Sequence, residues 1–328
     1  MSKVQDTGFL DKTPSLYSGG LLLNILGFHV IRTIFLSAWR LKPKNLNGRY
    51  KEILEILKQD GIVVIPDFFP RDQFDEIKKE YENLYADWKP SDFTYEKFNN
   101  RQKKFPEYFE TIAERFVTPD TPAFVKYFMN NEMIREVTSS IVHRRIRTRP
   151  YHHFWFLQSR NPDKKVDRLH IASFPHADVP YPTIKVFLYL NDVDESNAAY
   201  TYAKGSHKLT LKRIMLEYKL SVRYSRNGDD KVTEEELNLL GYRSEHICGK
   251  ANTLFISNNM GYHNRGIFST TMPRITAQLD YRNLESWRNT LNRGGSNIIS
   301  RLSKKFVKSL DNKTRLKNLA GISNNNMS

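Results

Sequence analysis

A series of short aromatic and β-branched segments after residue 150 most constrains the fold of this chain. The segments are "HHFWFLQ", "RLHIASF", "TIKVFLYL", "AAYTYA", "NTLFIS" and "RITAQLDYR", and turn residues separate them. This pattern is typical of an antiparallel sandwich or barrel. The connection over residues 208–249 is much longer than the others, and we expect it to be a helical excursion between two strands. We therefore predict that the second half of the chain is mainly β.

The first half of the chain has helical periodicity. The segment "RYKEILEILKQDG" predicts a helix that Gly61 ends, and "IVVIPDFF" after it predicts a buried strand. Pro70 begins a second helix, "RDQFDEIKKEYENLYADW", and "TPAFVKYFMNNEMIREVTSSIV" predicts a third. A chain of 328 residues can bury one large core, so we expect these helices to flank the β structure in one main domain over residues 46–282.

The net charge of +15 is concentrated at the two ends of the chain. Residues 1–45 carry six basic and two acidic residues, residues 283–328 carry nine and two, and the main domain is left with only +4. A nucleic-acid enzyme usually gathers positive charge beside its active site, so we expect no nucleic-acid partner. The basic ends, an N-terminal extension and a C-terminal tail, favour contact with anionic lipid or simply increase solubility.

The N-terminal extension contains an apolar run over residues 21–39, "LLLNILGFHVIRTIFLSAW". It can just reach across a bilayer, although Arg32 near its middle makes spanning marginal. Asn24, His29, Arg32 and Ser37 do not fall on one side at helical spacing, so an amphipathic interfacial helix is not clearly indicated. Two interpretations stay open: membrane contact, or a helix that packs on the main domain or forms a dimer. The flanking sequence does not resemble a secretory signal.

The C-terminal tail predicts a basic amphipathic helix, because Ile298, Leu302, Phe306 and Leu310 recur at intervals of four with Lys and Arg between them. It either docks on the main domain or contacts a membrane surface. The sole cysteine, Cys248, excludes an intramolecular disulfide and favours a reducing compartment. We expect a cytoplasmic protein, with membrane association left open and the oligomeric state not predicted.

Two histidines offer alternative starts for a metal site. His170 is followed two residues later by Ala172, whereas His176 is followed by Asp178. Non-haem Fe(II) oxygenases hold iron with two histidines and one carboxylate, and an H-x-D on a strand suits this because alternate side chains share a face. His176 and Asp178 meet this requirement, and His263 in "GYHNRG" can complete the triad. Alternatively, His176 and Asp178 lie in a surface turn, and His263 is a histidine at the end of a strand with no metal role.

The strand expected after His263 contains an arginine that can bind a cosubstrate. Arg274 lies eleven residues after His263 in "RITAQLDYR". Its planar guanidinium can hold the distal carboxylate of 2-oxoglutarate through two hydrogen bonds. Thr276, two residues on and therefore on the same face of a strand, can add a hydroxyl hydrogen bond. Taken alone, Arg274 also fits a surface salt bridge.

Together these segments resemble the phytanoyl-CoA dioxygenase family of iron and 2-oxoglutarate dependent oxygenases. The resemblance runs from about Ile53 to Arg282 and rests on "DGIVVIPDFF", "HADVPYPTIKVFLYLNDVD", "AKGSHK", "GKANTLFISNN" and "GYHNRG", with Arg274 beyond them. It implies a double-stranded β-helix core (a jelly roll, cupin-like) with helices packed outside. It also implies Fe(II), 2-oxoglutarate and dioxygen as cofactor and cosubstrates, with ascorbate helpful.

The resemblance further implies roles for single residues. Iron is held by His176, Asp178 and His263, Arg274 binds 2-oxoglutarate, and Phe187 lies near this cosubstrate.

The choice between the two histidines decides the reaction. Aligning His170 with the family motif requires a six-residue insertion and places Ala172 at the carboxylate position, as in related halogenases. Aligning His176 requires no gap and supplies the carboxylate, so hydroxylation is favoured over halogenation. His170 is then a histidine of the barrel or of the substrate pocket.

The chain departs from the family pattern in two turns. The usual Asn-Gly is Asn197–Ala198 here, which should alter the geometry of that turn but no ligand. The segment "AKGSHK" has Ala203 and Lys204 where Val and Pro are common. We interpret His207 in that segment as a structural turn residue.

The motifs do not specify the substrate. The basic ends and the apolar run favour an anionic lipid, acyl or lipid-linked sugar substrate that is hydroxylated at an aliphatic C–H bond, and the basic cluster "HRRIRTRP" from His143 can receive phosphate or carboxylate groups. That cluster fits an exposed basic loop equally well. The alternatives are an oxygenase of a soluble small metabolite and a non-catalytic, membrane-associated jelly-roll binding module.

Overall fold

The structure is a computed structural model, and it describes residues 17, 20–38, 46, 48–85, 113–116, 121–142, 153–159, 174–229 and 231–282. The chain forms two compact units. The barrel unit comprises residues 1–7, 35–213 and 231–283, and the helical unit comprises residues 8–34, 214–230 and 284–328. The predicted domain limits at residues 45 and 282 stay a prediction.

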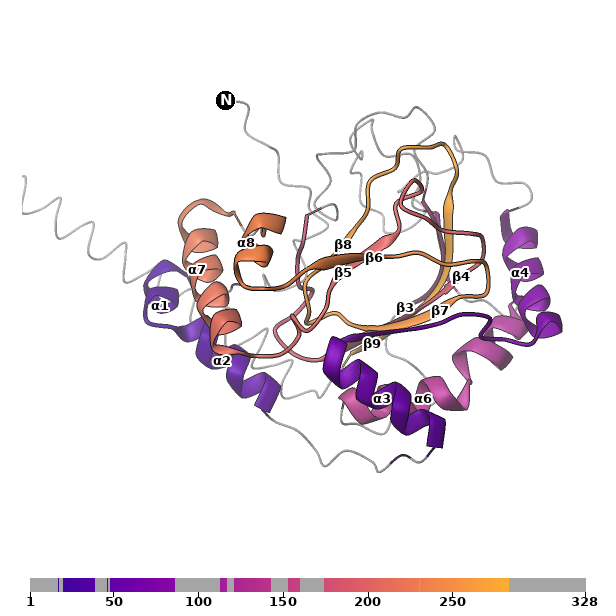
Figure 1. Cartoon of the computed structure of the whole chain (residues 1–328), viewed down its shortest axis with the longest axis horizontal. Coiled ribbons are helices and arrows are strands. Elements are labelled where there is room, and N and C mark those ends of the chain that lie inside the picture. The colour runs from indigo at the N-terminus through magenta and orange to yellow at the C-terminus, as the bar shows by residue number, and fades with distance from the viewer. Residues whose placement is uncertain are drawn as a thin grey trace, which may run out of the picture. The chain divides into compact units, whose positions relative to one another are not determined.

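The barrel unit contains two antiparallel sheets (Figure 1). The first has six strands in the order β1-β7-β4-β9-β3-β2, and the second has three in the order β6-β5-β8. The strands are β1 Ile62–Ile65, β2 Ala113–Phe116, β3 His153–Ser159, β4 Thr183–Tyr189, β5 Tyr200–Ala203, β6 Ser244–Ile247, β7 Leu254–Asn258, β8 His263–Arg265 and β9 Arg274–Arg282. The predicted β core with flanking helices, a jelly roll, is confirmed.

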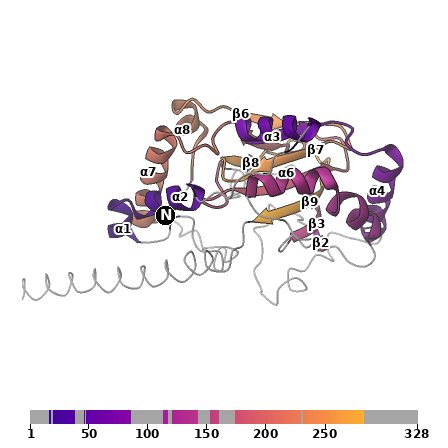
Figure 2. The ribbon, with the colours of Figure 1, turned by 90° about the horizontal axis from the view of Figure 1, so that it is seen from below.

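Helices precede and interrupt the sheets. They are α1 Leu21–Ile25, α2 Phe28–Ala38, α3 Gly48–Asp60, α4 Arg71–Tyr85, the π-helical turn η2 Phe124–Met129, α6 Glu132–Val142, α7 Leu211–Asn227 and α8 Glu234–Leu239. Helices α3 and α6 lie side by side and pack against strands of the six-stranded sheet (Figure 2). The predicted excursion over residues 208–249 contains α7 and α8, as expected, and also β6.

Alternation along β4 separates two hydrophobic cores. Ile184, Val186 and Leu188 belong to the core beneath the helices, whereas Phe187 and Tyr189 belong to a second core between the sheets. The central strands therefore bury both faces, which explains why they read as almost continuous apolar runs in the sequence. The face of β4 that carries Phe187 and Tyr189 points between the two sheets, and it is the face on which a binding site can form.

Local signals placed several element ends correctly. Gly61 ends α3 with a φ of +82°, a backbone conformation that glycine adopts without a steric penalty.

The predicted single helix over residues 121–142 is wrong, because the chain breaks at Asn130 and Asn131 into η2 and α6. The amides of Ala123 and Phe124 at the start of η2 donate hydrogen bonds to the Glu80 carboxylate of α4.

The apolar run in the N-terminal extension forms two helices, not one. Gly27 has a φ of +82° and separates α1 from α2. Among the described residues, no helix is both long and apolar enough to cross a membrane. Residues 168–173 of the strand predicted over 168–174, the basic cluster from His143 and the C-terminal tail lie outside the described residues.

Candidate metal centre

The H-x-D motif lies on an extended loop that backbone hydrogen bonds fasten to the end of the barrel. His176 and His263 exchange two backbone hydrogen bonds of 3.0 Å, and the Asp178 amide donates to the Asn259 carbonyl at 3.0 Å. The prediction that this motif lies on a regular strand is wrong. The alternation still holds because the loop is extended, and Ala177 is buried on the opposite side.

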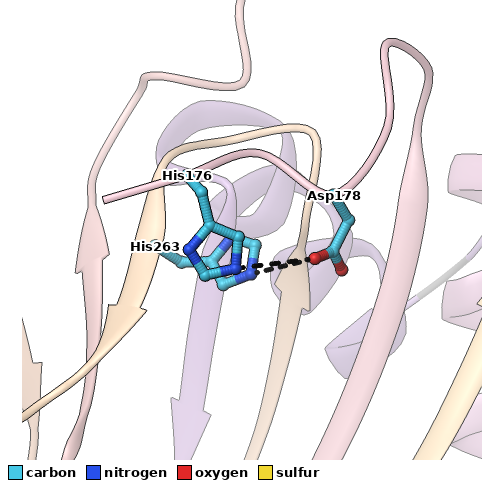
Figure 3. A group of neighbouring side chains, drawn as sticks. All are labelled: His176, Asp178 and His263. Atoms are coloured by element: carbon cyan, nitrogen blue, oxygen red, sulfur yellow. Dashed lines mark ion pairs between the residues drawn. The ribbon is translucent and has the colours of Figure 1, made fainter. Parts of the chain in front are cut away.

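The structure brings the three predicted ligands together (Figure 3). One ligand atom from each of His176, Asp178 and His263 lies within 4.8 Å of the other two. The Asp178 Oδ1 atom is 3.8 Å from Nε2 of His176 and 3.5 Å from Nε2 of His263. The His263 side chain is 5% exposed and that of His176 is 33% exposed, so the group is open on one side.

Hydrogen bonds fix the tautomers of both histidines. The Nδ1 atom of His176 lies 2.8 Å from the Phe174 carbonyl, and that of His263 lies 3.0 Å from the Gly261 carbonyl. A carbonyl oxygen only accepts hydrogen bonds, so each Nδ1 carries a proton, and Nε2 is the ring nitrogen that can bind a metal. Both Nε2 atoms lie within 3.8 Å of Oδ1 of Asp178, and metal-binding histidines likewise donate the other ring N–H to a carbonyl or carboxylate.

The two oxygens of Asp178 have different environments. Oδ1 faces the histidines, while Oδ2 lies 2.7 Å from Nζ of Lys185 and accepts a hydrogen bond from Nδ2 of Asn259 at 3.2 Å. Burial acts to raise the pKa of Asp178, but Lys185 and the two histidines outweigh it and hold this pKa well below its usual value. The carboxylate is therefore ionised at neutral pH.

The donor set fits a divalent transition metal. Burial, and then the neighbouring His263, lowers the pKa of His176 to about 4, so this imidazole is neutral at physiological pH. Two imidazole nitrogens and one carboxylate oxygen form the set that non-haem Fe(II) oxygenases use. Because Lys185 and Asn259 occupy Oδ2, Asp178 can offer a metal only Oδ1.

Sequence reasoning did not identify Lys185 and Asn259. A signal was present for Lys185, since it lies two residues before Phe187 and therefore on the inner face of an otherwise apolar strand. The amide of Asn259 also lies 2.9 Å from Nε2 of His263. Nothing in the sequence distinguishes Asn259 from the asparagine before it.

Arg274 and Thr276 share the inner face of β9, as predicted from their spacing. Arg274 is 8% exposed and donates to the Ala198 carbonyl, while its Nε is buried with no hydrogen-bond partner. None of the described carboxylates forms an ion pair with it. The Oγ1 of Thr276 is also buried without a partner. A buried guanidinium beside a hydroxyl that bonds nothing fits the carboxylate of a small dianion such as 2-oxoglutarate.

The turn that departs from the family pattern positions this arginine. Ala198 has a φ of +63°, in the left-handed region that favours glycine. Its carbonyl accepts the hydrogen bond from Arg274. This backbone conformation is strained for alanine, whereas glycine adopts it without a steric penalty.

Aromatic rings connect Phe187 with the triad. Phe187 packs against Tyr200 with 5.2 Å between ring centroids, and Tyr200 stacks on His263 at 5.5 Å. Burial raises the pKa of Tyr200 well above its usual value, and Asp178 adds to this effect. Burial lowers the pKa of Arg274, and Tyr200 acts against that change. Tyr200 is thus within electrostatic reach of both Asp178 and Arg274.

The remaining candidate histidines have other positions. Nε2 of His207 lies 3.1 Å from the Lys58 carbonyl, in the turn after β5. This contact agrees with a structural role for His207. His170 lies outside the described residues.

Comparison with solved structures returns proteins with low sequence identity. HygX from Streptomyces hygroscopicus, solved with nickel and 2-oxoglutarate, is 16% identical with a TM-score of 0.44, over 72% of this chain and 87% of HygX. EctD from S. alaskensis, solved with 2-oxoglutarate and 5-hydroxyectoine, is 18% identical with a TM-score of 0.47, over 74% and 81% of the two chains. At these TM-scores the similarity assigns neither activity nor substrate. A search of curated proteins found no match.

The family comparison is more direct. Residues 57–235, more than half of the chain, match the family described as phytanoyl-CoA dioxygenase. The matched residues include His176 and Asp178. His263 lies outside the match, and the structure places it beside these two residues. The chain therefore belongs to the phytanoyl-CoA dioxygenase family and is a non-haem iron, 2-oxoglutarate-dependent oxygenase.

Proposed function

We propose that His176, Asp178 and His263 hold Fe(II), and that the protein hydroxylates an aliphatic C–H bond of an anionic lipid, acyl or lipid-linked sugar substrate. The observation that carries the metal assignment is the convergence of two histidine Nε2 atoms and one carboxylate oxygen within 4.8 Å, with both Nδ1 atoms held by backbone carbonyls. When bound, the iron supplies C–H oxidation coupled to conversion of 2-oxoglutarate and dioxygen to succinate and carbon dioxide.

The protein's own residues position and isolate the reactants. Lys185 and Asn259 hold Oδ2 of Asp178, which leaves Oδ1 directed toward the histidines. Arg274 and Thr276 receive the distal carboxylate of 2-oxoglutarate, which satisfies polar atoms that the barrel otherwise buries without partners. Phe187 and Tyr200 form an apolar wall beside His263 that excludes water.

The substrate class is supported by charge and by the apolar N-terminal segment. The chain carries a net charge of +15, and a substrate with phosphate or carboxylate groups is attracted to such a protein. A membrane-borne substrate also accounts for the apolar segment over residues 21–39. A soluble small metabolite is the alternative, and the experiment below separates the two.

The test is formation of succinate by full-length protein with Fe(II), ascorbate and 2-oxoglutarate, across a panel of anionic lipids, lipid-linked sugars and small metabolites. We expect stoichiometric succinate with a lipid-type substrate, and its loss in the variants H176A, D178A and H263A together with loss of Fe(II) binding. The variant H246A, which changes an exposed histidine of β6, is the control and should keep both properties.

Arg274 gives a separate measurement within the same assay. R274A should raise the 2-oxoglutarate requirement roughly tenfold to a hundredfold and leave Fe(II) affinity unchanged, because a charge-assisted hydrogen-bond pair is lost. Stoichiometric turnover with small metabolites alone would contradict the lipid substrate. Tight Fe(II) binding in D178A would contradict the ligand set, and iron binding without any succinate would indicate a binding module.

A further inference from the structure

Helices α1 and α2 bury polar side chains and expose apolar ones, whereas α7 also buries Leu216 and Leu220 and exposes Lys219. Five polar residues of α1, α2 and α7 are at most 3% exposed: Asn24, His29, Thr33, Glu217 and Ser221. Nε2 of His29 lies 2.8 Å from Oε2 of Glu217, and Nδ2 of Asn24 donates to Oγ of Ser225 at 2.8 Å. These polar contacts hold α1 and α2 on α7.

The opposite sides of the same helices expose large apolar side chains. Leu26, in the turn between α1 and α2, is 68% exposed, Ile31 on α2 is 65% exposed, and Met215 on α7 is 54% exposed. We call the following set the apolar surface of α1 and α2: Leu21, Leu22, Ile25, Leu26, Ile31 and Ile34. Helices in contact with water show the reverse order, with the apolar stripe buried. The arrangement fits helices whose outer surroundings are apolar.

The charge of the surrounding sequence indicates which apolar surroundings these are. From Lys12 to Lys51 the chain contains seven basic residues and no acidic residue. Arg40, Lys42 and Lys44 follow α2 directly in sequence. Basic residues close to an apolar helix face favour anionic lipid headgroups. A second copy of the chain would instead bring the same basic residues together, which is repulsive.

We propose that the apolar surface of α1 and α2 inserts into the surface of an anionic lipid bilayer. The helices contain 5 and 11 residues, so they lie in the interface and do not cross it. The break at Gly27 gives each helix its own buried side, and α2 buries His29 and Thr33 one turn apart. This proposal concerns attachment and holds whether or not the protein hydroxylates a lipid.

The experiment is cosedimentation of full-length protein with phosphatidylcholine vesicles that contain or lack phosphatidylglycerol. We expect binding to the anionic vesicles, and weaker but measurable binding at high salt, because salt screens the charges and leaves the apolar contact. The double variant L26Q/I31Q should lower partitioning by roughly tenfold for each side chain removed from the bilayer. The control L239Q changes a residue of α8 that is 77% exposed, and it should bind like the unaltered protein.

Two further readings make the result decisive. Thermal unfolding and the mass in solution of L26Q/I31Q should match those of the unaltered protein, because both side chains face outward. A lower unfolding temperature, or loss of a dimer, would mean that another part of the chain or a second copy covers this surface, and would overturn the proposal. Absence of binding to anionic vesicles, or equal binding by L26Q/I31Q, would also overturn it. The assay needs neither iron nor 2-oxoglutarate, so it is independent of the catalytic proposal.

Discussion

At the scale of the residue, Lys185 and Asp178 form the charge pair on which the candidate metal centre depends. Their side chains are 18% and 16% exposed and the two atoms are 2.7 Å apart. We predict that K185M lowers the free energy of unfolding of the metal-free protein by about 2 kcal/mol, because the carboxylate keeps its charge in a largely buried position and loses a charged partner. The double variant D178N/K185M should recover most of this loss, since it leaves no unpaired charge.

A second lysine–carboxylate pair provides the matched control. Lys204 and Glu245 are also 2.7 Å apart, but their side chains are 41% and 51% exposed. K204M should therefore change the free energy of unfolding by less than about 1 kcal/mol. Urea unfolding of both variants at neutral pH makes the comparison, and equal losses would mean that burial adds nothing to the Lys185–Asp178 pair.

At the scale of the element, the junction between α3 and β1 requires glycine for two separate reasons. Gly61 has a φ of +82°, and a Cβ there would lie 2.3 Å from the Tyr202 hydroxyl and 2.4 Å from Nδ1 of His207. Gly241, after α8, has a φ of +84° and no atom within 4 Å of its Cβ position. We predict that G241A costs about 1 kcal/mol and that G61A costs more than about 2 kcal/mol. Chemical unfolding of both variants tests this. Similar losses of unfolding free energy would show that Tyr202 of β5 and His207 in the turn after it move to accommodate the added methyl group.

Elements with a periodic signal could be predicted from the sequence, and short or irregular ones could not. Strands β4 and β9 have seven and nine residues of β-branched and aromatic character, and both were predicted. Strand β8 has only three residues, too few for a pattern, so its presence depends on pairing with β5. The break of the predicted helix at Asn130 is equally invisible, because apolar spacing continues across it.

At the scale of the whole molecule, sequence reasoning identified the chemistry of the site but not its support. His176, Asp178, His263 and Arg274 belong to short motifs with fixed spacing, so they can be read locally. Lys185 acts through a contact between the strand and the loop before it, which only the fold reveals. The buried polar contacts between α2 and α7 likewise join residues about 190 apart in sequence, such as His29 and Glu217. We expected no common polar face in the apolar run over residues 21–39, because we treated the run as one continuous helix. The break at Gly27 divides it into α1 and α2, and each helix has its own buried side.

The stability of the molecule should depend on pH through two histidines that the fold keeps neutral. Burial is the main cause that lowers the pKa of both His176 and His207 from 6.5 to about 4. Between pH 6.5 and 4 the unfolded chain therefore binds protons at these positions that the folded chain does not bind. By linkage, the free energy of unfolding of the metal-free protein should fall as the pH is lowered through this range. Urea unfolding at a series of pH values measures the slope, and the variant H207N should reduce it.

A bound metal should change the contribution that only one of these histidines, His176, makes to the pH dependence of the free energy of unfolding. A metal ligated by His176 competes with the proton for Nε2, so saturating Fe(II) under anaerobic conditions should stabilise the protein and postpone the protonation of His176 to lower pH. His207, whose Nε2 donates to the Lys58 carbonyl, should titrate as before. The difference between metal-loaded and metal-free slopes should therefore persist in H207N and vanish in H176A. If H176A keeps that difference, His176 is not a ligand, and the motif that begins at His170 becomes the remaining candidate.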